Sequence, residues 1–574
     1  MTAWCACRGV LDSERARMWR PVIWLIVASA LAHLWCLGSQ FYMDDLSGIV
    51  NNDAIREGRF WQPLPLSWTQ LGYTVQYRLF GMSPVGFHAV NWLLHTAVAC
   101  VLFGFGRDFL RGRFPDGVAL LGALWFAVHP LASEIPNYTR TQDLAWVTLF
   151  SLLACWALLR FLRDGGWWKL GGCALGIVGA TLSKGPGMFH ALMMTSAIGL
   201  AFMTPAHWNL LRRRAWWLVG IVLFGLAVLW FTGIIPNLWQ ATRHWVEPRF
   251  IGHAYTLGRV FWEFAWRSVI PVALCSDHHI AETLVPAGAK WWNIPDTGAM
   301  VAAAAMLALT VVSGALAWRK STRLFGVCLF LYIATIGFRI LYLIPEFMPE
   351  YRIYPGLPWF CLGAAILLGA GWQALAGIHS PRVLAVLSVL VLAGLSAKRS
   401  LVWHDLDRLA ADILRQYPGQ GRAVWELQDR DLDARNWQMV IDRQRQVWPQ
   451  VFHAFLEENR RLAPRRELPT GHFALADVVC AGRYAIALAH VAGPGAGLAE
   501  IRRLERRMRG LRMDPVEHKL HWSYFFQSKV LVLEQAGDYQ AACDVIEREK
   551  PDPLSKADMA RVQGKLAAQW AAQQ

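Results

Sequence analysis

Charge is what this sequence has least of. Only 17% of its 574 residues are Asp, Glu, Lys or Arg, whereas 55% are hydrophobic. A soluble globular domain carries about 25% charged residues, so the composition argues against a soluble enzyme. The 11 cysteines are scattered without ligand spacing, which gives no reason to predict a zinc site. The long apolar runs instead indicate a membrane protein that crosses the bilayer several times.

The net charge of +15 would suit a protein that binds nucleic acid. The Lys and Arg residues, however, gather in short loops between apolar runs, where a membrane topology would put them. We therefore expect no nucleic acid among the partners. The 31 tryptophans fit anchoring at the membrane interfaces as well as burial among apolar residues.

Apolar runs recur as far as residue 398, and we expect about eleven membrane spans. The runs lie at 21–40, 84–106, 117–132, 142–160, 167–183, 186–203, 215–233, 297–317, 324–344, 356–376 and 383–398. Residues 1–20 form a basic lead-in, and no small-residue cleavage site follows the first run. That run is expected to remain as an anchor and not to be removed as a signal peptide.

Basic residues mark four short loops as cytoplasmic, because cytoplasmic loops carry an excess of Lys and Arg. Their basic residues are Arg107, Arg111 and Arg113; Arg160, Arg163 and Lys169; Arg212, Arg213 and Arg214; and Arg319, Lys320 and Arg323. The short loops on the opposite side hold only Arg140, Lys184 and Arg352. We expect a multi-pass protein of a bacterial inner membrane with its N-terminus in the cytoplasm.

This topology divides the chain into three parts. Residues 1–20 are the cytoplasmic N-terminus, and 21–399 form the transmembrane domain, with outer loops at 41–83 and 234–296. Residues 400–574 are richer in charge and regain helical periodicity. We expect them to form a helical soluble domain in the periplasm.

The C-terminal part contains Gly537, Asp538 and Tyr539, followed by Ala541, which is a tetratricopeptide-like turn between two helices. One partial repeat is equally compatible with an ordinary small helical domain, because stable repeat stacks need about three copies. Lys398 directly after the last run argues mildly against an extracytoplasmic location.

Two outer segments have amphipathic patterns. Arg259, Glu263 and Arg267 recur every four residues and give one charged and one aromatic face. This pattern predicts a helix that lies in the membrane interface. The loop 41–83 mixes aromatic and polar residues in the same way, and we expect it to be helical and packed over the bundle.

Two adjacent carboxylates, Asp44 and Asp45, follow the first apolar run almost at once. Acidic side chains at a membrane edge are costly unless something uses them. The pair suits oxygen ligation of a divalent cation such as Mg²⁺ or Mn²⁺, or the removal of a proton from a hydroxyl group. It also suits the capping of an interfacial helix, or simple exposure to water.

Other polar residues lie within the apolar runs or at their outer ends. His88, Asn91 and His95 are three and four residues apart, so they share one helix face, which either lines a site or holds helices together. The residues at outer ends are His129, Glu134, Arg140, Asp143, Lys184, Glu350, Arg352 and Tyr354. Acids beside a hydroxyl acceptor and cations beside an anionic group would make a reaction site. Lys184 and Arg352 suit a phosphate, although isolated basic residues at span ends also snorkel to the interface.

In this order the motifs resemble the GT-C superfamily of membrane-embedded glycosyltransferases that use lipid-linked sugars. Within it, the chain looks most similar to the group with transmembrane and tetratricopeptide parts and to its bacterial relatives. The motifs are Asp44-Asp45, Phe87-His88-x-x-Asn91-x-x-x-His95, Phe126-Ala127-Val128-His129-Pro130, Leu182-Ser183-Lys184 and Glu350-Tyr351-Arg352-Ile353-Tyr354. Two departures concern the acceptor: Gly185 stands where relatives often have an acid, and Ala132-Ser133-Glu134 stands where they often repeat a histidine.

The resemblance implies an all-α, GT-C-like membrane bundle that transfers a sugar with inversion from a polyprenyl-phosphate donor on the extracytoplasmic side. It implies Asp44 as base or metal ligand, with Asp45 as the alternative. Lys184 and Arg352 are expected to bind the donor phosphate, and we add Arg140 as a third cation. The residues expected to line the cavity are His88, Asn91, His95, His129, Glu350 and Tyr354.

The expected partners are the lipid-linked sugar, membrane lipid and an acceptor hydroxyl. The acceptor is a protein, such as a surface or pilin protein, or a lipid-linked glycan. A flippase or other transporter of lipid-linked sugars is the alternative, because it would need the same cavity and cations without the chemistry. Transporters often show inverted repeats and broken spans in matching halves. Neither is clear in this sequence.

Overall fold

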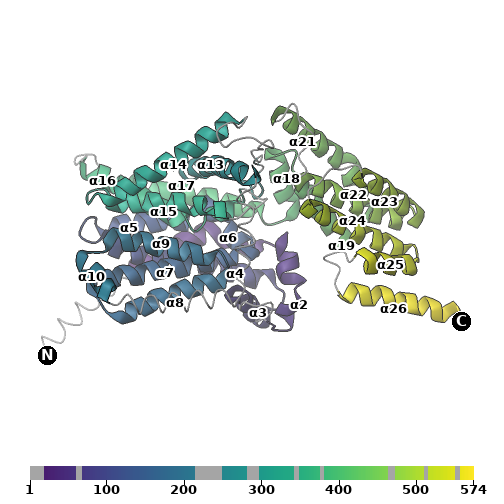
Figure 1. The fold of residues 1–574 in the computed structure, drawn as a ribbon, viewed down its shortest axis with the longest axis horizontal. Coiled ribbons are helices and arrows are strands. Elements are labelled where there is room, and N and C mark those ends of the chain that lie inside the picture. Colours follow the sequence, from purple (N-terminus) through teal and green to yellow (C-terminus); the bar gives the residue numbers. More distant parts are fainter. Residues whose placement is uncertain are drawn as a thin grey trace. The chain divides into compact units, whose positions relative to one another are not determined.

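The computed structural model describes residues 19–59, 67–213, 248–278, 280, 296–341, 348–374, 381–462, 472–509, 515–549 and 556–573. Within these ranges all regular elements are helical, apart from an isolated bridge between His278 and Met348. The predicted all-α class is therefore confirmed. The chain forms two compact units, Met1–Asp405 and Leu406–Gln574 (Figure 1).

The first unit begins with a helix at Trp19–Gly38. Its other helices are α2 (Asp53–Arg56), α3 (Trp68–Phe80), α4 (Pro84–Leu110), α5 (Asp116–Ala127), α6 (Glu134–Asn137), α7 (Gln142–Asp164), α8 (Trp167–Ser183), α9 (Gly187–Phe202), α10 (Pro205–Arg213), α13 (Pro248–Val269), α14 (Thr297–Trp318), α15 (Arg323–Gly337), α16 (Leu357–Ala374) and α17 (Pro381–Val402). Each predicted apolar run coincides with one of these helices except 215–233, which lies outside the described residues.

Six helices in the described part of the chain are long and apolar enough to cross a membrane. They are Trp19–Gly38, Pro84–Leu110, Thr139–Asp164, Thr297–Trp318, Arg323–Ile340 and Val383–Val402. A seventh candidate is a broken pair, Asp116–Ala127 with Pro130–Asn137, bent by 55°. The total of about eleven spans stays a prediction, because α9 and much of α16 count only as shorter apolar helices.

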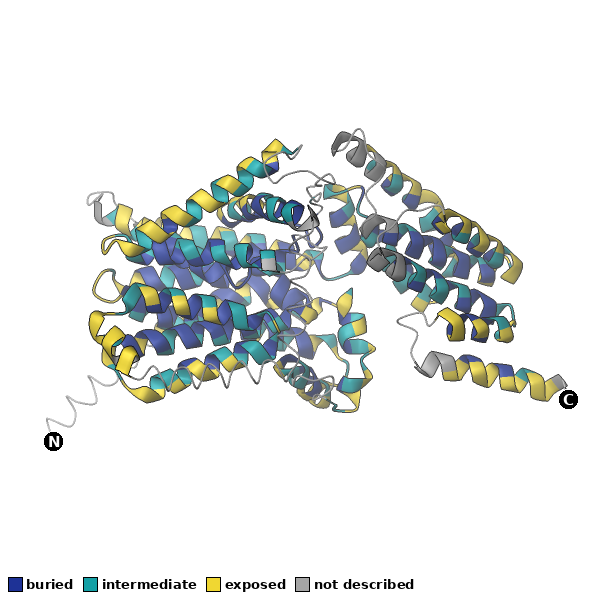
Figure 2. Cartoon of the chain, in the orientation of Figure 1, coloured by how far each residue is buried: buried dark blue, intermediate teal, exposed yellow. Residues whose placement is uncertain are grey.

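Apolar side chains on the outside of this unit match a lipid environment. Figure 2 shows α14 largely exposed, and Val301, Leu307 and Val311 on it are each at least 65% exposed. In water such a face would be an aggregation liability, whereas in lipid it needs no cover.

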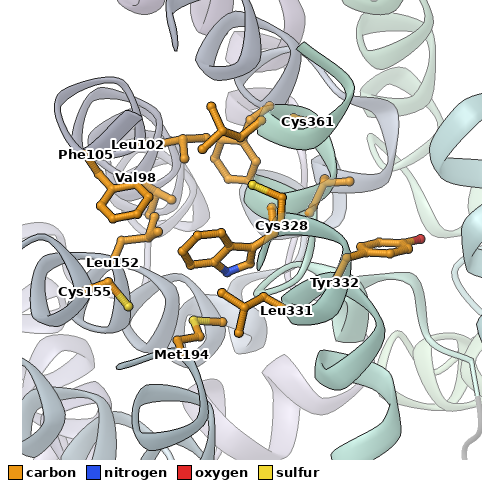
Figure 3. Packing of buried hydrophobic residues seen from close by; sticks show 14 of the residues in the cluster. Val98, Leu102, Phe105, Leu152, Cys155, Met194, Cys328, Leu331, Tyr332 and Cys361 are labelled. Atoms are coloured by element: carbon orange, nitrogen blue, oxygen red, sulfur yellow. The ribbon is translucent and has the colours of Figure 1, made fainter. Parts of the chain in front are cut away.

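The interior of the first unit is packed with apolar side chains from most of its long helices. In Figure 3, side chains from α4, α7, α9, α15 and α16 converge. The labelled residues are Val98, Leu102, Phe105, Leu152, Cys155, Met194, Cys328, Leu331, Tyr332 and Cys361. Because lipid is as apolar as these side chains, close packing contributes more to holding the helices together than does the hydrophobic effect.

The described parts of the two segments predicted to be amphipathic contain helices in the structure. Arg259, Glu263 and Arg267 lie on α13, and Val260, Phe261 and Phe264 of the same helix are buried. The described part of the loop 41–83 contains α2 and α3. That either segment lies in a membrane interface stays a prediction.

The second unit contains only helices in its described residues. They are α18 (Leu406–Gln416), α19 (Gly421–Asp433), α20 (Trp437–Asp442), α21 (Trp448–Leu462), α22 (His472–Val491), α23 (Pro494–Arg509), α24 (Pro515–Gln535), α25 (Tyr539–Glu549) and α26 (Lys556–Gln573). The predicted turn lies between α24 and α25, where Gly537 has a φ of 71° that favours glycine. The tetratricopeptide assignment stays a prediction.

Candidate active site

The chain between α5 and α7 breaks into short helical turns, although helices pack around it. Irregular backbone at membrane depth is tolerated only where protein satisfies its polar groups. Two fully buried side chains of α4 do this. His88 Nδ1 lies 2.9 Å from the carbonyl oxygen of Pro136, and Asn91 Nδ2 donates to that of Ile135 at 2.7 Å. These contacts favour the packing interpretation of this helix face.

Three more residues expected to line a cavity also have partners inside the bundle. His95 lies with Nε2 3.1 Å from the carbonyl oxygen of Ala127 and Nδ1 2.9 Å from the hydroxyl of Tyr354. A carbonyl only accepts, so Nε2 carries the hydrogen and Nδ1 accepts from the tyrosine. His129 Nε2 lies 3.0 Å from the carbonyl oxygen of Ser268. His95, His129 and Tyr354 are each exposed by 2% or less.

The two adjacent aspartates have different surroundings. Met43 directly before them has a φ of 50°, a left-handed conformation that costs a residue other than glycine about 1–2 kcal/mol. Asp44 is exposed, whereas Asp45 is fully buried. The oxygens of Asp45 accept hydrogen bonds from two backbone amides, that of Tyr42 at 3.2 Å and that of Arg140 at 2.6 Å.

Asp45 ties the first outer loop to the start of α7. Burial raises its pKa to about 8, although the backbone amides of Tyr42 and Arg140 act in the opposite direction. Both of its oxygens already accept from backbone N–H groups and the side chain is fully buried, so Asp45 is poorly placed for contact with a substrate or a metal. Of the two candidate catalytic acids, the geometry favours Asp44 as the one that reaches a substrate.

Four charged residues from distant parts of the sequence form a row, which we call the charged row: Asp44, Arg140, Asp143 and Lys184. Arg140 is close enough to interact electrostatically with both Asp44 and Asp143. Its side chain runs against Gly48, where an added Cβ would lie 2.8 Å from Arg140 Nε. Asp143 lies one helical turn further on and pairs with Lys184 at 2.7 Å.

Lys184 is placed by the tight hairpin between α8 and α9. An added Cβ on Gly187 would lie 2.1 Å from the carbonyl oxygen of Ala180, so only glycine fits where α9 starts against α8. The hydroxyl of Thr69, on α3 of the first outer loop, donates to the carbonyl oxygen of Ser183 at 2.9 Å. The loop that carries Asp44 therefore also contacts the hairpin that carries Lys184.

Arg352 is linked to the loop that carries Asp44 by a series of contacts that includes two tyrosines, Tyr351 and Tyr138. It lies on a short helical turn, η7 (Glu350–Ile353), and its guanidinium lies 5.8 Å from the ring centroid of Tyr351. The Tyr351 ring lies 6.3 Å from the ring of Tyr138. The hydroxyl of Tyr138 in turn accepts a hydrogen bond from the backbone amide of Asp44 at 3.2 Å.

Glu350 anchors this turn from within the bundle. It is fully buried, and its Oε1 accepts from the backbone amide of Cys275 and lies 2.7 Å from His278 Nε2. The backbone amide of Tyr351 donates to Glu134 Oε2 at 2.5 Å. Both carboxylates thus position the turn that carries Arg352.

Some residues of this region had no assigned role in the sequence analysis. Asp143 stands three residues after Arg140, which places both on one helix face, and this spacing was a usable signal. Tyr138 and His278 follow no spacing that would single them out, because their contacts come from segments far away in the sequence.

Few side chains near Asp44 could bind a divalent cation. In the described residues no group of three or more His, Cys, Asp or Glu side chains is placed to hold a metal ion. Asp45 is buried and bonded to backbone amides, so Asp44 is the more accessible carboxylate of the predicted pair. Mg²⁺ is often bound by one or two carboxylates together with water and substrate phosphate, so its involvement stays a prediction.

Comparison with known proteins gives sequence relatives of one kind. Protein O-mannosyl-transferase F38B6.6 of Caenorhabditis elegans is 24% identical over 456 residues, which cover 73% of this chain and 61% of that protein. The chain thus spans about three fifths of the length of the worm protein. Protein O-mannosyl-transferase TMTC1 of Mus musculus is 32% identical over 187 residues, covering 26% of this chain and 19% of that protein.

The Tmtc1 protein of Drosophila melanogaster is 34% identical over 165 residues, covering 25% of this chain and 19% of that protein. These matches bear out the resemblance to protein O-mannosyl-transferases. No family model matches the chain. Among solved structures, ArnT from Cupriavidus metallidurans bound to undecaprenyl phosphate aligns with a TM-score of 0.36 and 14% identity, covering 92% of this chain and 79% of that chain.

Proposed function

We propose that this protein is a membrane glycosyltransferase that moves a sugar from a polyprenyl-phosphate donor to an acceptor hydroxyl group. The observation that carries the proposal is the charged row. It brings one exposed acid, Asp44, and two cations, Arg140 and Lys184, together from three segments of the chain. The similarity to protein O-mannosyl-transferases supports the same class of reaction.

The chemistry needs little beyond this arrangement. The acceptor oxygen forms a bond to the anomeric carbon of the sugar while the bond from that carbon to the phosphate oxygen breaks. Asp44 takes the proton of the acceptor hydroxyl. Arg140 and Lys184 stabilise the negative charge that grows on the departing phosphate, and Arg352 supplies a further cation to the donor. The protein mainly has to position the two reactants.

The setting of the reaction follows from the distribution of basic residues. We place the charged row and residues 400–574 on the periplasmic side of a bacterial inner membrane, with the N-terminus in the cytoplasm. The lipid tail of the donor remains in the bilayer beside the bundle. The acceptor is a protein, such as a surface or pilin protein, or a lipid-linked glycan, and Mg²⁺ or Mn²⁺ is a candidate cofactor at Asp44.

Mass spectrometry of periplasmic and surface glycoproteins and glycolipids tests the proposal. Four strains are compared: wild type, a deletion, Asp44→Ala and Asp53→Ala. Asp53 is a matched control, because it is an exposed aspartate of the same loop at the start of α2. We expect one sugar to disappear from one acceptor in the deletion and in Asp44→Ala only. An unchanged glycan profile in the deletion would refute the proposal.

A flippase for lipid-linked sugars is the second candidate, favoured by the same cations. It would move the phosphate group without removing a proton from an acceptor. A glycan change in the deletion with none in Asp44→Ala would therefore favour it, provided that both aspartate variants reach the membrane in wild-type amounts.

A further inference from the structure

Asp143 is the member of the charged row that the proposed reaction does not use. Its carboxylate pairs with Lys184 at 2.7 Å, and only 14% of its side chain is exposed, against 36% for Lys184. Its other oxygen, Oδ1, is buried and accepts no hydrogen bond from the residues that the structure describes. A partly buried carboxylate with one oxygen unbonded is stabilised by the positive charges beside it, and Lys184 is the one that it contacts directly.

The position of this pair is unusual for a purely structural contact. Asp143 lies in the first turn of α7, three residues after Arg140. Lys184 directly follows the last residue of α8, in the turn that leads to α9. Thr69 of the first outer loop contacts Ser183 beside the lysine. The ion pair therefore joins α7 to the turn between α8 and α9, and the neighbouring Thr69–Ser183 hydrogen bond adds the first outer loop. Lys184 is the more exposed partner of the pair.

We infer that Asp143 is a positioning residue that holds Lys184 ready for the donor phosphate and takes it back when the lipid phosphate leaves. The inference rests on the proposed function. A polyprenyl-phosphate sugar carries one negative charge on its phosphodiester. When the bond between sugar and phosphate oxygen breaks, the electron pair stays with that oxygen and the product phosphate carries two.

A lysine shared between Asp143 and the phosphate binds the doubly charged product phosphate more strongly than the singly charged donor. Such a preference assists the chemical step, because only contacts that strengthen towards the transition state raise the rate. It would also trap the product, were there no competing anion. Asp143 supplies that anion, so the lysine returns to it and the lipid phosphate is released.

Binding of farnesyl phosphate, a short-chain polyprenyl phosphate, to the full-length protein in detergent tests this role. Asp143→Asn keeps the shape of the side chain and removes the competing charge. We expect it to bind farnesyl phosphate about five- to tenfold more tightly than the wild type, and Lys184→Gln to bind it about as much more weakly. In the double variant the effect of Asp143→Asn should become much smaller, because only its weaker influence through Arg140 then remains in the charged row.

Steady-state kinetics of sugar transfer distinguish this role of Asp143 from a purely structural one. Asp143→Asn should lower kcat and KM for the donor together, because product release becomes slow while binding improves. The matched control is Asp164→Asn, which breaks a similar pair with Lys169 at 3.3 Å at the opposite end of the α7–α8 hairpin. We expect its affinity and turnover to be those of the wild type. Farnesol, which lacks the phosphate, should bind every variant equally.

The outcomes separate this inference from the proposed function. If the wild type binds farnesyl phosphate and Lys184→Gln weakens binding, while Asp143→Asn has wild-type affinity, the role of Asp143 is refuted and the phosphate site stands. An Asp143→Asn effect of undiminished size in the Lys184→Gln background would also refute it. If the wild type shows no preference for farnesyl phosphate over farnesol, the phosphate site itself is refuted, and the role of Asp143 with it.

Discussion

Asp44 and Asp45 are neighbours in one loop, yet their side chains have opposite environments. Asp45 is buried and accepts hydrogen bonds from the backbone amides of Tyr42 and Arg140. Asp45→Ala would leave these amides without their acceptor, at a cost of roughly 1–3 kcal/mol in the free energy of unfolding. We expect a lower melting temperature in detergent for this variant and no change for Asp44→Ala. Equal losses in the two variants would contradict the different roles.

The pKa of Asp45 adds a dependence on pH. Because burial raises it to about 8, the folded protein keeps a proton that the unfolded chain loses above about pH 4. The contribution of this group to stability is therefore full below about pH 4 and is lost as the pH rises to about 8.

Asp45→Asn has no group that titrates here. We therefore expect its melting temperature, relative to that of the wild type, to rise between about pH 4 and pH 8 and then to level off. Thermal unfolding in detergent at a series of pH values measures the difference. A difference that stays constant across this range would contradict the raised pKa.

The Asp pair is visible in the sequence, whereas the different surroundings of its two side chains are not. The sequence pointed to an Asp pair but contains nothing that says which carboxylate faces inward. That depends on the backbone amide of Arg140, which is 95 residues away. Lys184 and Arg140 were predicted as phosphate ligands, and the structure brings both into the charged row. Their partner Asp143 was visible in the sequence only through its spacing from Arg140.

At the scale of elements, the polar face of α4 supports the broken segment between α5 and α7. Asn91 donates to the carbonyl oxygen of Ile135 at 2.7 Å and accepts from Gln142 Nε2 at 2.8 Å. Asn91→Leu would take this donor from the Ile135 carbonyl and leave Gln142 Nε2 with its longer contact to Gln76 at 3.4 Å, at a total cost of about 1–3 kcal/mol.

We expect Asn91→Leu to lower the melting temperature in detergent well below that of Leu93→Ala. Leu93 is a suitable control, because it lies on the same helix with 55% of its surface exposed. If the two variants melted at the same temperature, the polar face of α4 would not be what stabilises the broken segment.

The sequence predicted the positions of the helices. It predicted the break after α5 only in part. Apolar runs mark helices because a membrane span needs about 20 such residues. The run 117–132 contains a bend of 55° between α5 and the turn at Pro130. Proline cannot continue the backbone hydrogen bonds and favours an extended residue before it, and His129 has a ψ of 127°. That signal was present, but hydrophobicity alone does not show it.

In the molecule as a whole, contacts between residues far apart in the chain could not be predicted from the sequence. The order of the motifs predicted a class of enzyme, and the sequence relatives agree with it. That Tyr351 reaches Glu134 across 217 residues, however, depends on how the helices pack. No local pattern encodes such a contact, because each partner alone looks like an ordinary polar residue at a helix end.

The second unit, Leu406–Gln574, has an apolar core of its own. None of its described helices is a candidate membrane span. Because of this core, we expect residues 406–574, expressed alone, to be helical by circular dichroism and to unfold cooperatively. Expression only as an aggregate that lacks a cooperative transition would contradict this.

A buried ion pair within this unit provides a sharper test of the isolated unit. Asp431 is 2% exposed and accepts hydrogen bonds from Arg443 at 2.6 Å and from Arg430 at 2.9 Å. Both arginines also pair with Asp407, so Asp431→Asn leaves their charges partly compensated, but it weakens two charge-assisted hydrogen bonds to a buried group, at a cost of roughly 1–3 kcal/mol. Asp431→Asn should therefore destabilise the isolated unit, whereas Asp442→Asn, which removes a surface contact with Gln438, should have a much smaller effect. Equal stability of these variants would mean that the isolated unit does not retain the packing that it has in the full chain.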